Sequence, residues 1–308
     1  MEDSRKLHRA SINLLFLEWQ TWLLALLVHI GWAFATVYYF AIPWPVLFVL
    51  GAYLVALHGS FQHETVHGHP TTKVWINTVI ASLPLGLLVP YGIYRESHMR
   101  HHRTDNLSHP SDDPESFFVR ASVWDRMSPA MRAYYWTLHT LAGRMLLGPI
   151  HHTVVLIKQE LPKLLSFERR AWRIFSAHLI ASGLVLYWVL VVCAMPLWLY
   201  LLCFVYAGAG LGLLRSYLEH QPAQQLNERT AIVDAAWPWS MLFLHNNLHV
   251  VHHEFPHMPW YQIRSYFKRH REQILGHNGH YAFSGYGEVF WRFSFRPKTS
   301  PRFPDALG

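Results

Sequence analysis

Histidines gather in three dense groups along this sequence. They read HETVH at residues 63–67, HMRHH at residues 98–102 and HVVHH at residues 249–253. On a helix, side chains three or four positions apart share a face, so each group directs two or three imidazoles to one point. Neutral imidazole is a ligand for zinc, copper, nickel and iron. The spacing therefore predicts metal binding.

The number of histidines exceeds what a single closed zinc site needs. The three groups supply eight imidazoles, whereas such a zinc site takes four ligands. A ninth candidate is His220, which directly follows a long apolar segment. We therefore predict two metal ions of higher coordination number.

The first group also matches HExxH, the motif of zinc-dependent proteases. In that chemistry His63 and His67 would bind one zinc ion, and Glu64 would act as the general base. A zinc-dependent membrane hydrolase is thus an alternative from another class. It leaves the other histidine groups without a role.

The composition indicates a membrane protein. The 308 residues are 52% hydrophobic and only 15% charged, against about 25% charged residues in a soluble protein. The two cysteines are too few for a disulfide scaffold, or for an iron–sulfur cluster with its roughly four cysteine ligands. The positive net charge is better explained by binding to anionic lipid than by nucleic acid, so no nucleic-acid partner is expected.

The elements that position the histidines follow from two long gaps without Lys or Arg. The gaps lie between Arg9 and Lys73 and between Arg173 and Arg215, and each has room for two helices of about 20 residues. Prolines at 43, 45 and 196 break each gap in the middle. We expect an all-α integral membrane protein with four transmembrane helices in two hairpins, at residues 20–42, 46–62, 172–195 and 197–217.

A third apolar run at residues 72–94 is interrupted by prolines and glycines. We predict that it is re-entrant or interfacial, because a crossing would put residues 63–67 and 98–102 on opposite sides of the membrane. All Lys and Arg then lie on one side, which the positive-inside rule makes cytoplasmic. The whole chain, 1–308, would form one multi-pass domain, in the inner or cell membrane if bacterial. Its termini, its active site and a helical cap (95–170 and 221–308) would be cytoplasmic, with one interfacial helix at 134–157.

Four segments together resemble the membrane fatty acid desaturase and hydroxylase superfamily. They are HETVHGHPT at 63–71, ESHMRHHR at 96–103, RSYLEH at 215–220 and NNLHVVHHEFP at 246–256. The resemblance covers roughly residues 20–260. It implies a di-iron centre on the cytoplasmic side that activates O2 and is reduced by an outside donor. The ligands it implies are His63, His67, His98, His101, His102, His220, His249, His252 and His253, with Asn246 as a further candidate, directly or through water.

These features lead us to expect an O2-dependent di-iron oxidoreductase acting on a fatty acyl chain or similar lipid-like substrate, by desaturation. Hydroxylation, ketolation and oxidative decarboxylation remain alternatives on the same scaffold. The chain has no flavin, haem or ferredoxin motif, so we expect a separate donor of ferredoxin, rubredoxin or cytochrome type, with its reductase. A metal transporter is disfavoured, because the histidines lie at one membrane face and do not line a path at the midplane.

Two further sets of residues could support such a site. Small residues at 207–212 would allow close helix packing, which we favour, or leave room for an acyl chain. Carboxylates are expected to orient the ligand imidazoles, whereas residues 112–115 (DDPE) are expected to form a turn at the cap surface. The candidate carboxylates are Glu64, Glu96, Asp105, Asp112, Asp113, Glu219 and Glu254.

Overall fold

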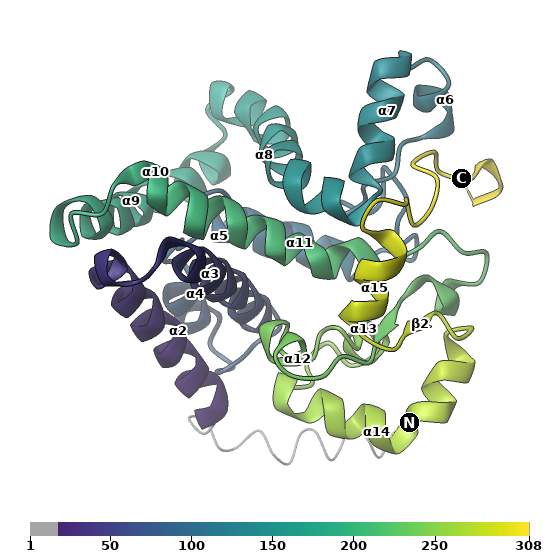
Figure 1. Ribbon diagram of the computed structural model, residues 1–308. Coiled ribbons are helices and arrows are strands. Elements are labelled where there is room, and N and C mark those ends of the chain that lie inside the picture. The colour runs from purple at the N-terminus through teal and green to yellow at the C-terminus, as the bar shows by residue number, and fades with distance from the viewer. Residues whose placement is uncertain (1–17, 308) are drawn as a thin grey trace.

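The computed structural model describes residues 18–307 and is almost entirely helical (Figure 1). Four of its helical segments are long and apolar enough to cross a membrane, which confirms the prediction of an all-α integral membrane protein with four spans. The N-terminus, which we predict to be cytoplasmic, lies outside the residues that the structure describes. The four segments are α2 (Trp19–Val37), α3 (Trp44–Val66), Arg169–Val192 and Leu197–Glu219.

The last two spans each combine α-helix with a π-helical stretch. Residues 169–192 consist of α9 (Arg169–Tyr187) and η2 (Trp188–Val192). The following span consists of α10 (Leu197–Tyr200), η3 (Leu201–Tyr206) and α11 (Ala207–Glu219). Backbone groups therefore stay paired within each span, as the hydrocarbon core of a bilayer requires.

Both pairs of spans are joined by short turns that carry no charge. The first helix ends at Val37 and not at residue 42, because the chain tightens into the 3-10 helix η1 (Tyr39–Ala41) before Pro43. In the second hairpin Pro196 caps the start of α10. The first turn holds α2 and α3 side by side, whereas the contacts within the second pair are concentrated next to the turn, between η2 and α10.

Close helix packing is made possible by glycines in the spans. A Cβ atom on Gly208 of α11 would lie 2.5 Å from the Cβ of Val55 on α3, and one on Gly210 would lie 2.6 Å from the carbonyl oxygen of Met145. A Cβ on Gly212, in contrast, would meet no atom within 4 Å. The favoured role of close packing is therefore seen at Gly208 and Gly210, whereas Gly212 borders open space.

The apolar run between the two hairpins forms no helix of spanning length. It contains α4 (Val74–Ala81), which at 1.5 Å per residue extends only about 12 Å, against about 30 Å for a hydrocarbon core. The chain then turns and enters α5 (Tyr91–His101), which begins after Pro90. Residues 63–67 and 98–102 can therefore reach the same place.

The prediction of a single helix at residues 134–157 is wrong. The chain instead forms α7 (Pro129–Leu138) and α8 (Leu141–Leu165), which meet at an angle of 110°. Thr140 caps α8 by accepting a hydrogen bond from the backbone N–H of Gly143. A Cβ on Gly143 would lie 1.9 Å from the carbonyl oxygen of Thr137, so this corner requires glycine.

The rest of the chain packs at one end of α11. Figure 1 shows α13, α14 and α15 at this end, away from α9 and α10. The two short strands pair in parallel, with Ile232 opposite Ala282 and Val233 opposite Phe283. The remaining elements are α6 (Ala121–Trp124), η4 (Leu226–Arg229), β1 (Ile232–Val233), α12 (Trp239–Leu242), α13 (His249–Glu254), α14 (Trp260–His277), β2 (Ala282–Phe283), α15 (Tyr286–Phe293) and η5 (Asp305–Leu307).

Candidate metal centre

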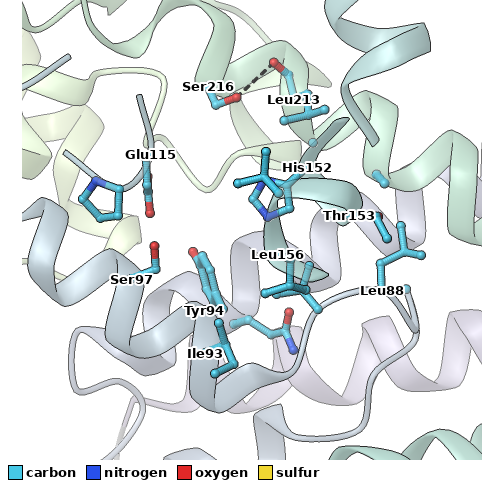
Figure 2. Close-up of a pocket in the computed structure, with 18 of the residues that line it drawn as sticks. Leu88, Ile93, Tyr94, Ser97, Glu115, His152, Thr153, Leu156, Leu213 and Ser216 are labelled. Carbon is cyan, nitrogen blue, oxygen red and sulfur yellow. Dashed lines mark hydrogen bonds between the residues drawn. The ribbon is translucent and has the colours of Figure 1, made fainter. Parts of the chain in front are cut away.

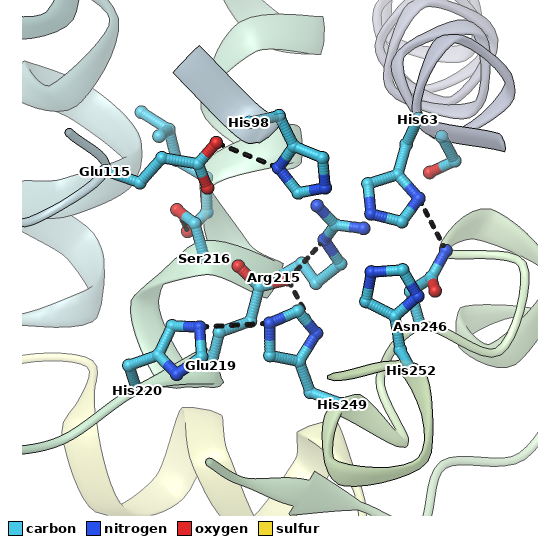
Figure 3. A network of polar contacts seen from close by, with 12 residues as sticks. His63, His98, Glu115, Arg215, Ser216, Glu219, His220, Asn246, His249 and His252 are labelled. Carbon is cyan, nitrogen blue, oxygen red and sulfur yellow. Dashed lines mark hydrogen bonds and ion pairs between the residues drawn. The ribbon is translucent and has the colours of Figure 1, made fainter. Parts of the chain in front are cut away.

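All nine predicted histidines come together where α3, α5 and α11 end and α13 begins. Within each of two groups, one potential ligand atom per residue lies within 4.8 Å of all the others. Several of these residues are seen in Figure 3. The first group is His63, His67, His98, His102 and His252, and the second is His101, His220, His249 and His253.

Within the first group the Nε2 atoms point toward one another. The distance from Nε2 of His98 is 3.0 Å to that of His67 and 3.1 Å to that of His102. His252 lies 3.0 Å from His102, again between Nε2 atoms. The Nε2 atom of His63 is buried and has no hydrogen-bond partner among the described residues.

The second group has the same arrangement. Nε2 of His220 lies 3.0 Å from that of His101 and 3.1 Å from that of His249. His253 adds a fourth Nε2 atom, 3.2 Å from His249. The rings of His102 and His253 stack with their centroids 4.3 Å apart, so the two groups are adjacent.

Carboxylates behind the rings fix which nitrogen carries the proton. Nδ1 of His98 lies 2.9 Å from Oε1 of Glu115, and Nδ1 of His101 lies 2.8 Å from Oδ1 of Asp113. Burial lowers the pKa of His98, so its ring is neutral, and a proton on Nδ1 leaves only a lone pair on Nε2. Lone pairs that face other nitrogens about 3 Å away repel unless a cation lies between them. The residues present therefore fit a pair of metal ions.

Burial keeps most of these imidazoles in the neutral form that binds metals. It lowers the pKa of His252 and His253 well below the ordinary value, and that of His102 to about 2. His101 differs: burial lowers its pKa, but the carboxylates of Glu115 and Asp113 outweigh burial and raise it to about 9. A metal ion at its Nε2 would therefore have to displace a proton.

Three of the candidate carboxylates lie against imidazoles of the centre, and one important carboxylate was missed. Asp113 bonds His101, Oε1 of Glu219 lies 3.4 Å from Nδ1 of His249, and Glu64 lies 3.6 Å from Nδ1 of His63. Glu96 instead pairs with Arg170. The expectation that residues 112–115 form only a surface turn is wrong, because Glu115 bonds His98 and Asp113 is buried.

Asn246 lies beside the first group, on the outer side of His63. Its Nδ2 is 3.2 Å from Nδ1 of His63 and 3.3 Å from Oε1 of Glu64, and its Oδ1 is buried without a partner among the described residues. His257, which the sequence did not single out, donates from Nδ1 to the carbonyl oxygen of His67. Both residues brace the first histidine group from outside.

A cavity of about 810 Å³ lies next to the two groups, between α3, α5, α8 and α11 (Figure 2). Tyr94, Glu115 and Glu219 line the cavity. Because these three residues also contact histidine rings, the cavity lies close to the histidines. Leu88 and Leu156 form part of an apolar wall, which Gly212 continues. The cavity is large enough for an elongated apolar molecule.

The sequence matches the family model for fatty acid desaturases over residues 39–285, well over half of its length. The chain belongs to the fatty acid desaturase family. A search of curated proteins found no match to this sequence. In this desaturase-family enzyme, His63 and His67 of the HExxH motif lie in a group with three further histidines, which a protease with one zinc ion would not need.

Proposed function

We propose that this protein is a membrane-bound, O2-dependent di-iron oxidoreductase that desaturates an acyl chain. The observation that carries the proposal is the convergence of nine imidazoles in two adjacent groups beside a cavity with an apolar wall. Desaturation removes two hydrogens from adjacent carbons. The substrate and an outside donor each give two electrons, and O2 takes up all four with four protons to form two water molecules.

The chain's own residues would hold and orient the metal ions. Two iron ions bound by the nine histidines would supply the oxidising power toward unactivated C–H bonds that no side chain has. Glu115 and Asp113 fix the rings of His98 and His101, and Asn246 braces His63. Such outer contacts keep ligand orientation and basicity constant during turnover.

The cavity would bind the acyl chain and keep water from it. The open space at Gly212 leaves room for the chain between α3 and α11. Leu88, Leu156 and their neighbours would exclude water from the chain. A substrate placed there lies beside the histidine groups, since Tyr94 and Glu115 belong both to the cavity wall and to the surroundings of His98.

We infer that the histidine groups face the cytoplasm and that an external protein delivers the electrons. The turns at residues 38–43 and 193–196 carry no Lys or Arg, so the positive-inside rule supports a cytoplasmic position for the rest. The basic cap would suit an acidic donor of ferredoxin, rubredoxin or cytochrome type. Opposite charges would guide such a donor to the metal side of the protein.

Metal analysis combined with lipid mass spectrometry tests the proposal. The purified active protein should contain about two iron ions per chain, and cells that express it should contain lipids that have lost two hydrogens. A gain of oxygen would assign hydroxylation or ketolation, and a loss of carbon dioxide would assign decarboxylation. One zinc ion and no iron in active protein would refute the proposal in favour of a hydrolase.

Substitution of single histidines tests the ligand set. His101→Ala and His252→Ala, one in each group, should abolish activity and lower the iron content. His270→Ala is the matched control, because Nδ1 of His270 bonds the carbonyl oxygen of Tyr266 within the cap helix α14. Full turnover in either of the first two variants would contradict the ligand assignment.

A further inference from the structure

Positively charged side chains line the cavity, and half of them have no carboxylate partner. Three of them, Lys163, Arg170 and Arg215, each form an ion pair with a glutamate that lines the same cavity. Within residues 18–307, the side chains of the other three make no ion pair and no hydrogen bond. These three residues, which we call the arginine edge, come from α5 and the turn after it: Arg95, Arg100 and Arg103.

The carboxylates of the cavity are already paired and do not neutralise the arginine edge. Three of the four belong to the ion pairs with Lys163, Arg170 and Arg215. The fourth, Glu115, bonds Nδ1 of His98 at 2.9 Å. The excess positive charge of the cavity therefore lies on the arginine edge.

Two members of the arginine edge are neighbours at the end of α5. The backbone N–H of Arg103 donates to the carbonyl oxygen of Arg100 at 3.0 Å, so the helical turn continues to Arg103. Side chains three positions apart on a helix are adjacent, and like charges at this spacing repel. Arg100 and Arg103 are exposed and Arg95 is half-buried, which places the arginine edge at the mouth of the cavity. An anion bound there would remove the repulsion.

The cavity is apolar near the beginning of α5. Leu88 and Ile93 line it there, whereas Arg100 lies in the last turn of the same helix, about 10 Å further along its axis than Ile93. Tyr94 lies between them, and its ring stacks on that of His98 with centroids 5.6 Å apart. A molecule with an anionic group on the arginine edge and an apolar chain along Leu88 and Ile93 would therefore pass next to the first histidine group.

We propose that the arginine edge binds an anionic group at the polar end of the substrate, a phosphate or a carboxylate, and thereby holds the acyl chain in the cavity beside the histidine groups. This inference rests on the proposed function. A guanidinium group can pair with either anion through two parallel hydrogen bonds. Because each such pair is weak at an exposed position, the three arginines must act together to give a clear preference.

Three ligands of equal chain length test the inference: hexadecyl phosphate, hexadecanoate and hexadecanol. Purified, iron-loaded protein in the uncharged detergent dodecyl maltoside is titrated with each labelled ligand at low salt. At least one of the anions should bind tenfold or more tightly than the alcohol, and this preference should fall as salt is added. The anion that binds more tightly identifies the group. A smaller preference, or one that does not fall with salt, would overturn the inference.

Variants locate the anionic group on the arginine edge. Arg95→Gln, Arg100→Gln and Arg103→Gln should each lower the preference about threefold, the effect of one exposed ion pair, and the triple variant should abolish it. Arg169→Gln is the matched control, because Arg169 is exposed on α9 but does not line the cavity. A triple variant that keeps the preference would refute the role of the arginine edge.

Iron analysis of each variant separates loss of the anion site from damage to the metal centre. Arg100 and Arg103 adjoin His101 and His102 in the sequence, whereas Arg95 lies three residues before the nearest predicted ligand. Arg95→Gln should therefore keep its iron while it loses part of the preference. An unchanged preference in iron-loaded Arg95→Gln would contradict the inference, whatever the other variants do.

Competition experiments distinguish the sources of the anion. Phosphatidylglycerol presents a phosphate on a membrane lipid, an acyl thioester of phosphopantetheine presents one on a soluble carrier, and unlabelled hexadecanoate represents a free acid. The competitor that displaces the labelled anion at the lowest concentration identifies the source. Displacement by none of the three would overturn the inference.

Binding and turnover separate this inference from the proposed function. If the protein oxidises lipids but shows no preference for an anionic ligand, the inference fails and the proposed function stands. If the protein prefers an anionic ligand through the arginine edge but oxidises no lipid, the proposed function fails and the anion site stands.

Discussion

The carboxylate of Glu115 offers the sharpest single test of how the centre is built. It bonds Nδ1 of His98 at 2.9 Å and holds the proton there, so that Nε2 presents a lone pair to the first histidine group. In Glu115→Ala that proton is free to move to Nε2. The imidazole must then lose it, and must also be held in place without a partner, before it can bind a metal ion.

The expected loss follows from the role of a carboxylate behind a metal-binding imidazole. Removing a partner of this kind typically weakens metal binding 10- to 100-fold, or by about 1.4 to 2.7 kcal/mol. The ring of His98 is buried, but Glu115 lines the cavity and is 28% exposed, so water can partly replace the lost carboxylate. We therefore expect the lower end of this range, with one of the two iron ions held about 10-fold more weakly.

Competition with chelators of graded strength, followed by iron analysis, measures this loss. Asp112→Ala is the matched control, since Asp112 lies in the same loop but is exposed and bonds Asn106. Asp113 is a poorer probe, because it also accepts hydrogen bonds from the backbone of Ser108 and Glu115, and its removal would disturb the loop itself. If Glu115→Ala retains both iron ions with an affinity within threefold of the unaltered protein, the reasoning is refuted.

Three further predictions concern packing and topology. Gly208→Ala should lower the free energy of unfolding by about 1–3 kcal/mol through overpacking against Val55, whereas Gly212→Ala should leave it unchanged; thermal unfolding in detergent compares them. Gly143→Ala should lower the melting temperature more than Gly208→Ala, because the tight corner before α8 has no room for a Cβ, and an equal or smaller effect would contradict this. A cysteine at the exposed position Phe40 and one at Glu272 should be labelled from opposite sides of the membrane in intact cells. Labelling from the same side would refute the topology.

The spans and the histidine groups could be predicted from the sequence because their signals are local. The long gaps without Lys or Arg mark the apolar helices, and the i, i+3 and i+4 spacing in residues 98–102 and 249–253 marks residues that share a helix face. The requirement that all groups meet then restricted the topology. Residues 72–94 could therefore not cross the membrane, which agrees with the short helix α4.

Contacts between distant segments could not be predicted in the same way. Glu115 follows His98 by 17 residues in an irregular loop, and neither spacing nor periodicity marks it as the partner of that ring. The corner between α7 and α8 depends on the hydrogen bond that caps α8 at Thr140 and on one glycine in an otherwise helical pattern. The cavity combines residues of α3, α5, α8 and α11 whose proximity only the folded chain reveals.

The C-terminal segment explains how an irregular loop can hold two carboxylates in place. Backbone hydrogen bonds join Val119 to Pro301 and Phe303, at 2.9 Å and 2.8 Å, so the segment clamps the end of the loop that carries Asp113 and Glu115. The Nζ of Lys298 donates to the carbonyl oxygen of His220, at 2.8 Å. The same segment thus contacts both the loop behind α5 and a histidine of the second group. Contacts beyond the spanning helices therefore fix histidines from distant parts of the chain relative to one another.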